Sequence, residues 1–148
     1  MISFGTNLLL YSLNRDCPEY PGARAFFVSL PAAPGEVAVC ELVLVELYVL
    51  LRNPAVLQNP LTAPDAAALV QIFRQHPTWT LIDHPGGTST VMDEVWRRAA
   101  ESNVGRRGIF DARLALTLRH HGVTEFATRT AAHFSGFGFP RVWNPLPN

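Results

Sequence analysis

The chain has 148 residues and a mass of 16.3 kDa, which is the size of one domain. Hydrophobic residues make up 48% of it and charged residues only 16%, so it can bury a core and is neither a disordered nor a purely electrostatic binder. Its 12 basic residues are all arginine and balance 12 acidic residues, so no overall field attracts nucleic acid.

No segment indicates a membrane or exported protein. The longest apolar stretch, residues 42–51, is interrupted by Glu46 and is too short to span a bilayer. Residues 1–4 lack the basic and apolar regions of a signal peptide. Cys17 and Cys40 form no CxxC motif, which excludes a zinc ribbon. We therefore expect a cytoplasmic protein without membrane contact.

Strand-like and helix-like segments alternate along the chain. Strands are predicted at residues 2–4, 36–39, 79–82 and 123–128, with an edge strand at 139–143. Helices are predicted from Thr6 onward, at 21–30 and 41–51, from Thr62 onward, and at 89–101 and 109–121. This alternation predicts an α/β fold with a mainly parallel sheet, whose functional crevice lies at the carboxyl ends of the strands.

Glu46 is the first acid that needs an explanation. On a helix its neighbours at three and four positions are all apolar, namely Leu42, Val43, Val49 and Leu50. We expect this face to be buried, and a buried carboxylate needs a cation, an arginine or a proton. A structural ion pair and a cation-binding role are both open, and the second is favoured.

Asp111 has equally apolar helical neighbours in Leu114, Ala115 and Leu118. Alone it is typical of an acid in the first turn of a helix, where free N–H groups and the helix dipole stabilise it. Together with Glu46 it indicates a shared acidic pocket. Asp93 and Glu94 indicate a solvated helix start with local ion pairs, and Asp93 is a minor candidate for the pocket.

An apolar set lies in or beside the proline-rich connector that follows the 41–51 helix. Its members are Leu50, Leu51, Val56, Leu57 and Leu61. A solvent-exposed patch of this kind usually marks an interface, so we expect a two-fold homodimer.

Four short stretches carry a more specific pattern. They are residues 2–11 (ISFGTNLLLY), 40–47 (CELVLVEL), 110–123 (FDARLALTLRHHGV) and 127–134 (ATRTAAHF). In this order, spanning nearly the whole chain, they resemble the motifs of PIN-domain ribonucleases, in particular the VapC-type toxins of bacterial toxin–antitoxin pairs.

The resemblance implies a single PIN-like domain over residues 1–148, with three α/β/α layers and a parallel sheet of four to five strands. It implies that Glu46 and Asp111 hold Mg²⁺ or Mn²⁺, which activates water to cut RNA. It also implies that Thr6, Asn7, Thr128 and Arg129 lie beside the substrate. The implied partners are RNA, tRNA or rRNA by class, and a small cognate antitoxin.

Two positions depart from the family pattern. Gly5 stands where the family has its first acid, and His133 stands where the family has an Asp before Phe134. The departure at Gly5 predicts an inactive form of the nuclease with weak or absent metal binding, unless the turn needs glycine for its backbone. His133 is a candidate to bind Mn²⁺ or phosphate in place of the acid.

Two other functions remain open from the sequence. One is a non-catalytic PIN-like module that binds RNA or a protein, and the other is an unrelated α/β domain that holds a small phosphorylated ligand. Convergence of Glu46 and Asp111 near Gly5 would argue against the unrelated domain.

Overall fold

The computed structural model describes residues 1–87 and 90–147, and within these ranges it contains two parallel strand ladders. In one ladder β4 (Glu125–Ala127) lies between β1 (Ile2–Phe4) and β5 (Arg141–Trp143). In the other, β2 (Ala38–Cys40) pairs with β3 (Thr80–Ile82). Each pairing is parallel, with Ile2 opposite Glu125 and Glu125 opposite Arg141 in the first ladder. The predicted parallel α/β arrangement is confirmed.

The two ladders are joined through β1 and the residues around β2, so the sheet is less continuous than the single sheet we predicted. The contact is one parallel bridge between Ile2 and Val37, with the Ile2 N–H donating to the Glu36 carbonyl at 2.8 Å. Further along, the Ser3 hydroxyl donates to the Ala38 carbonyl at 2.8 Å. The Ala38 carbonyl therefore accepts a hydrogen bond from a side chain, whereas in a continuous ladder it would accept one from a backbone N–H.

The helices fall close to the predicted positions. They are α1 (Thr6–Leu13), α2 (Tyr20–Ser29), α3 (Glu41–Leu51), α4 (Ala63–Arg74), α5 (Thr90–Ala99) and α6 (Gly108–His120), with a 3₁₀ turn η1 (Ala131–Phe134). The bounds of α3 match the prediction, since the residue before Pro54 disfavours further helix. Ser89, the predicted first residue of α5, lies outside the described residues.

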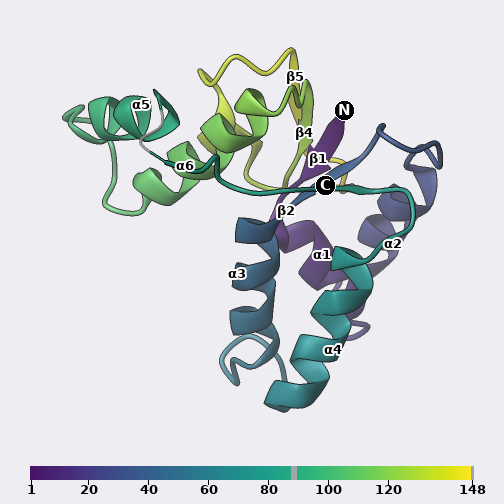
Figure 1. Ribbon diagram of the computed structural model, residues 1–148. Coiled ribbons are helices and arrows are strands. Elements are labelled where there is room, and N and C mark those ends of the chain that lie inside the picture. The colour runs from purple at the N-terminus through teal and green to yellow at the C-terminus, as the bar shows by residue number, and fades with distance from the viewer. Residues whose placement is uncertain (88–89, 148) are drawn as a thin grey trace.

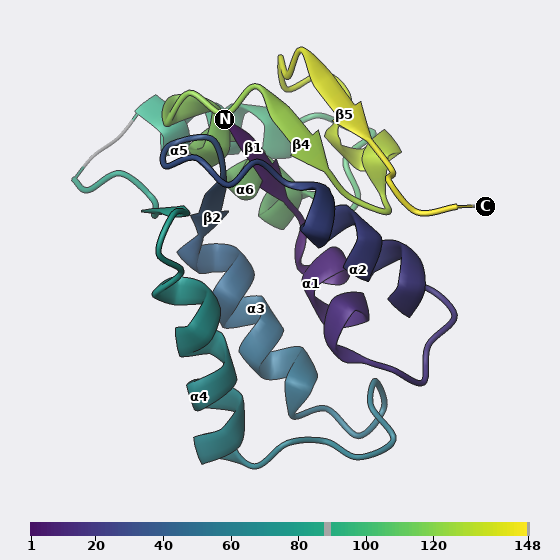
Figure 2. The ribbon, with the colours of Figure 1, turned by 90° about the vertical axis from the view of Figure 1, so that its right-hand side faces the viewer.

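Helices flank the strands on both faces. In Figure 1 the α5–α6 pair lies to the left of the strands and α2 to the right, and Figure 2 shows α1 to α4 grouped below them. Among the described residues, no helix is long and apolar enough to cross a membrane.

Aromatic side chains fill much of the core on both sides of β1 and β4. The Phe4 ring meets Phe27 edge-on at 5.0 Å and Trp79 at 5.1 Å. The Phe126 ring meets Phe134 at 4.7 Å. These contacts hold the first and fourth strands, and therefore their carboxyl ends, in fixed positions.

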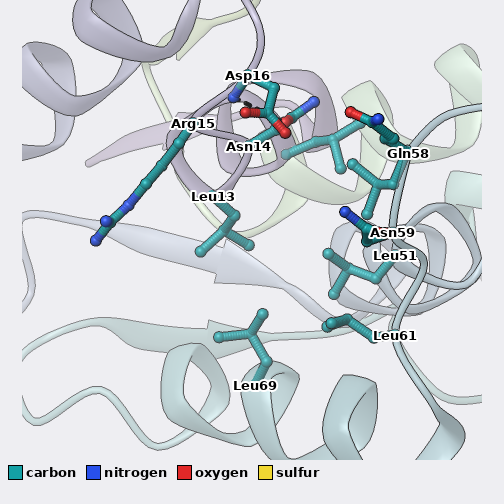
Figure 3. A pocket seen from close by; sticks show the side chains of 11 residues that line it. Leu13, Asn14, Arg15, Asp16, Leu51, Gln58, Asn59, Leu61 and Leu69 are labelled. Carbon is teal, nitrogen blue, oxygen red and sulfur yellow. Dashed lines mark hydrogen bonds between the residues drawn. The ribbon is translucent and has the colours of Figure 1, made fainter.

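The leucines of the proline-rich connector turn partly inward, and the homodimer expected from this apolar set stays a prediction. Leu51 is only 2% exposed, and Leu57 and Leu61 are half-buried. The Leu61 N–H donates to the Leu51 carbonyl at 2.8 Å, which folds the connector back over the end of α3. Figure 3 shows Leu51, Leu61 and Leu69 pointing into a cavity of about 400 Å³. The connector therefore covers part of the apolar set, while Val56 is 37% exposed.

Candidate functional site

Gly5 lies where β1 ends and α1 begins, beside the end of β4. Its N–H donates to the Ala127 carbonyl at 2.9 Å. Its backbone has φ −80° and ψ 162°, which is extended conformation that any residue adopts. The turn therefore does not require glycine, and that explanation of Gly5 is wrong.

The surroundings of Gly5 leave little space for a side chain. A Cβ at this position would lie 3.0 Å from Thr128 Oγ1 and 3.3 Å from Thr128 Cβ. The Asn7 amide donates to Thr128 Oγ1 at 3.2 Å, and the Arg129 N–H donates to Asn7 Oδ1 at 3.3 Å. Thr128 and Asn7 thus form a hydrogen-bonded wall beside Gly5.

Glu46 reaches the same neighbourhood from α3. Its Oε2 accepts a hydrogen bond from the Thr6 hydroxyl at 3.0 Å, one residue after Gly5. The side chain is exposed rather than buried, as are Val45 and Val49 on the same helix. The expectation of a buried Glu46 is wrong, because the face that carries it is covered only in part: its helical neighbour Val43 is buried, whereas Val49 is exposed. The carboxylate is open to solvent and available to a ligand.

Asp111 lies in the first turn of α6 and faces His133 of η1. The His133 Nδ1 and Asp111 Oδ2 atoms are 3.4 Å apart, and they form an ion pair when the imidazole is protonated. Partial burial raises the pKa of Asp111 above its usual range, while His133 and, to a smaller extent, Arg107 act to lower it. Asp111 is therefore a half-buried acid whose charge depends on a neighbouring histidine.

Glu46, Asp111 and His133 line one pocket of about 560 Å³ between α3, α6 and η1. The same pocket is lined by Arg107, Phe110 and Arg113, which the sequence analysis did not single out. A usable signal was present, because Phe110 has arginines three positions away on either side. The pocket therefore combines acids, arginines, an imidazole and an aromatic ring.

The pocket offers a small set of metal-binding groups. In residues 1–87 and 90–147, no three His, Cys, Asp or Glu side chains lie close enough together to hold a metal ion. Two carboxylates in one pocket match the smallest donor set from which Mg²⁺ is bound, when waters and substrate phosphates complete its shell. The residues present thus fit a weak divalent site.

Several predicted residues do not line this pocket. Gly5, Thr6, Asn7 and Thr128 lie together beside the ends of β1 and β4, and two further residues lie elsewhere. Asp93 is exposed on α5 and does not line the pocket. Arg129 has its backbone beside Asn7, but its guanidinium forms an ion pair with Glu19 and donates to the Tyr11 hydroxyl at 3.2 Å. The side chain of Arg129 is therefore already occupied by two partners.

A parallel sheet flanked by helices, with Glu46 beside the carboxyl end of β1 and Asp111 in the same pocket, is the arrangement expected for the PIN-like α/β nucleases that the sequence resembles. No family model matches the chain. It is 56% identical over 146 residues to "Ribonuclease VapC24" of Mycobacterium tuberculosis, in two strains, which covers 99% of this chain and 97% of that protein. The chain belongs to the VapC family of PIN-domain ribonucleases, and this membership implies use of a divalent metal.

Solved structures agree with this assignment at the level of fold. The M. tuberculosis toxin VapC20, described as cleaving the sarcin–ricin loop, has a TM-score of 0.69 at 19% identity and covers 94% of this chain and 96% of its own. FitAcB from Neisseria gonorrhoeae has a TM-score of 0.67 at 20% identity and covers 98% of both chains. The expectation of a PIN-like fold is confirmed, and an unrelated α/β domain is excluded.

Proposed function

We propose that this chain is a single PIN-like domain and a VapC-type toxin built to hydrolyse phosphodiester bonds in RNA, in a form inactivated at Gly5. The observation that carries the proposal is the placement of Glu46. Its hydrogen bond to Thr6 sets one acid beside the end of β1, and the pocket that it shares with Asp111 supplies a second. Gly5, at the end of the same strand, contributes no carboxylate.

Glu46 and Asp111 are the residues that would hold Mg²⁺ or Mn²⁺ in this proposal. When bound, such a cation supplies activated water and offsets negative charge on phosphate. Arg107 and Arg113 bring positive charge to the same pocket and would orient the RNA backbone. His133 would govern the charge of Asp111 through their 3.4 Å contact.

The remaining parts of the proposal concern partners and location. The substrate is RNA, tRNA or rRNA by class, and a small antitoxin masks the protein in the cytoplasm. Thr6, Asn7 and Thr128 lie beside the scissile position. Homodimerisation stays a prediction from the sequence. Light scattering of the protein alone at several concentrations tests it.

The decisive substitution is Gly5→Asp, assayed with Mn²⁺ on total tRNA. We expect negligible cleavage by the chain as it stands and a gain above 100-fold in the variant, since an acid that binds metal directly exceeds the roughly 10- to 100-fold effect of its supporting groups. Thr128 must shift by a few tenths of an ångström to admit the new side chain.

Two control variants distinguish the effect of the new carboxylate charge at position 5 from the effect of adding a side chain there. Gly5→Ala introduces the same Cβ contact without a carboxylate, and we expect it to remain inactive. Gly5→Asp combined with Glu46→Gln keeps the new acid but removes its partner, and we expect activity to be lost again. Cleavage by the unaltered chain at the rate of the aspartate variant would overturn the account of Gly5.

A second candidate function is an RNA-binding or protein-binding module without catalysis. The observation that favours it is the lack of a three-residue metal-binding group in the described part of the chain. The same experiment separates the two functions, because a Gly5→Asp protein that binds Mn²⁺ but cuts no RNA would support the module.

A further inference from the structure

Phe110 is a large aromatic residue that the fold leaves in solvent. Its side chain is 64% exposed, although it lies in the first turn of a helix whose next residues, Ala112 and Ala115, are buried. Single exposed apolar side chains are common on protein surfaces, and Trp96 is similarly exposed here, so a reason for the position of Phe110 has to come from its neighbours.

The neighbours of Phe110 supply such a reason. It directly precedes Asp111, and it lines the same pocket of about 560 Å³ as Glu46 and His133. The Arg107 guanidinium lies over its ring, 5.6 Å from the centroid. Neither Arg107 nor Arg113 has an ion-pair partner among the residues described. A ring and two arginines thus surround two acids.

An exposed ring beside two arginines matches the chemistry of unpaired RNA. Aromatic rings and guanidinium planes stack on unpaired nucleobases, and arginines without carboxylate partners attract phosphates. A duplex offers no free base face, whereas a loop or single strand offers both base and phosphate. A purely apolar partner would leave the arginines unpaired.

We propose that Phe110, with Arg107, forms a stacking platform for one unpaired nucleobase next to the scissile phosphate. This inference rests on the proposed function, because it assigns a substrate-binding role within the same pocket. It makes Phe110 a determinant of RNA binding that selects single-stranded over paired RNA.

The test measures the affinity of the unaltered chain for a 12-nucleotide single-stranded RNA that carries 2-aminopurine, with EDTA present so that no metal contributes. Stacking is expected to quench the 2-aminopurine fluorescence at one position. Phe110→Leu keeps an apolar side chain but removes the ring, and should weaken binding by about 5- to 150-fold. Phe110→Trp should retain the affinity.

A matched control lies on α5. Trp96 is 62% exposed, nearly the same as Phe110, but it does not line the pocket. Trp96→Leu should change the affinity by less than about two-fold, a difference too small to reflect a lost stacking contact. The duplex form of the same RNA should bind Phe110→Leu and the unaltered chain equally.

Several results would overturn the inference. They are absence of RNA binding by the unaltered chain, equal affinities of the Phe110→Leu and unaltered proteins, or an equal loss in Trp96→Leu. A change in oligomeric state of Phe110→Leu without a change in RNA affinity would assign the ring to a protein interface and also reject the platform. Failure of Gly5→Asp to cleave, with Phe110-dependent binding intact, would reject the nuclease proposal alone.

Discussion

Asp111 experiences opposing influences on its pKa. Partial burial raises the pKa and is the larger effect, whereas the facing His133 lowers it. A carboxyl group with a raised pKa accepts a proton at a higher pH than an ordinary aspartate does. Under the proposed function, cation binding through Asp111 should therefore weaken at a higher pH than it would for an ordinary aspartate, as the pH falls.

Replacing His133 with alanine should raise the pKa of Asp111 further, because the imidazole charge and hydrogen bond are lost. The native state then binds a proton more tightly than the unfolded state, so the contribution of Asp111 to stability falls as pH rises through its native pKa. Titration of the Asp111 carboxyl carbon by NMR measures the shift. His120→Ala, at an exposed position outside the pocket, is the control. An unchanged or lowered Asp111 pKa in His133→Ala would contradict the prediction.

The candidate residues differ in how far the sequence could predict them. Glu46 and Asp111 stood out because each is an acid among apolar helical neighbours, and the structure brings both to one pocket. The exposure of Glu46 was not predictable, since helical spacing tells which residues share a face but not whether another element covers that face. Phe110 was missed because an aromatic residue beside Leu114 fits a buried helix equally well.

At the scale of an element, α5 carries charge pairs along its length. Glu94 accepts from Arg97 at 2.7 Å and from Arg98 at 2.9 Å. These arginines lower the pKa of Glu94 to about 2. The prediction of local ion pairs from the sequence is confirmed here, because residues three and four positions apart on a helix are neighbours.

Acid should weaken α5 within a defined pH range. A carboxyl group whose native pKa is depressed contributes stability that is present above its ordinary value of 4.5 and lost as pH falls toward about 2. We expect Glu94→Gln to remove this part of the acid dependence of the melting temperature. The pH profiles of both proteins between 2 and 7, followed by circular dichroism, give the comparison. Parallel profiles would show that the pairs contribute nothing.

At the scale of the whole molecule, the C-terminal segment closes over α2. Leu146 is 7% exposed and belongs to the main core. Gly22 of α2 lies directly beneath this segment, and a Cβ there would come within 2.8 Å of Pro147 Cδ. Glycine at this position therefore allows the end of the chain to approach the helix.

Gly22→Ala should displace the C-terminal segment and partly expose Leu146. Full burial of a leucine contributes about 1.5–3 kcal/mol, whereas alanine within α2 gains up to about 1 kcal/mol of helix propensity, so we expect a net loss of about 1 kcal/mol in the free energy of unfolding. Urea denaturation measures it. Gly105→Ala is the matched control, because a Cβ at Gly105 would meet no atom within 4 Å. Equal stability of the Gly22→Ala and unaltered proteins would mean that the C-terminal segment shifts without exposing Leu146.

The parallel arrangement was predictable from alternating strands and helices, because a parallel pair needs a long crossover. The division into two ladders was not. Between β1 and the residues around β2, the backbone forms only one described bridge, at Ile2, and the Ser3 hydroxyl bonds to the Ala38 carbonyl beyond it. Neither feature leaves a periodic signal in the sequence. The inward turn of Leu57 and Leu61 escaped prediction for the same kind of reason, since it follows from how a connector folds back.

The backbone conformation of Gly5 bears on how easily an aspartate could replace this glycine. Its φ and ψ already suit an aspartate, and its N–H is paired with Ala127 whatever the side chain. An aspartate codon and a glycine codon can differ by a single base. The tightest contacts that an added Cβ would make in the described structure are with Thr128, at 3.0 Å from its Oγ1 and 3.3 Å from its Cβ. Where the Gly5 codon is GGT or GGC, one base change would give aspartate, and under the proposed function that change would supply the first acid of the family pattern.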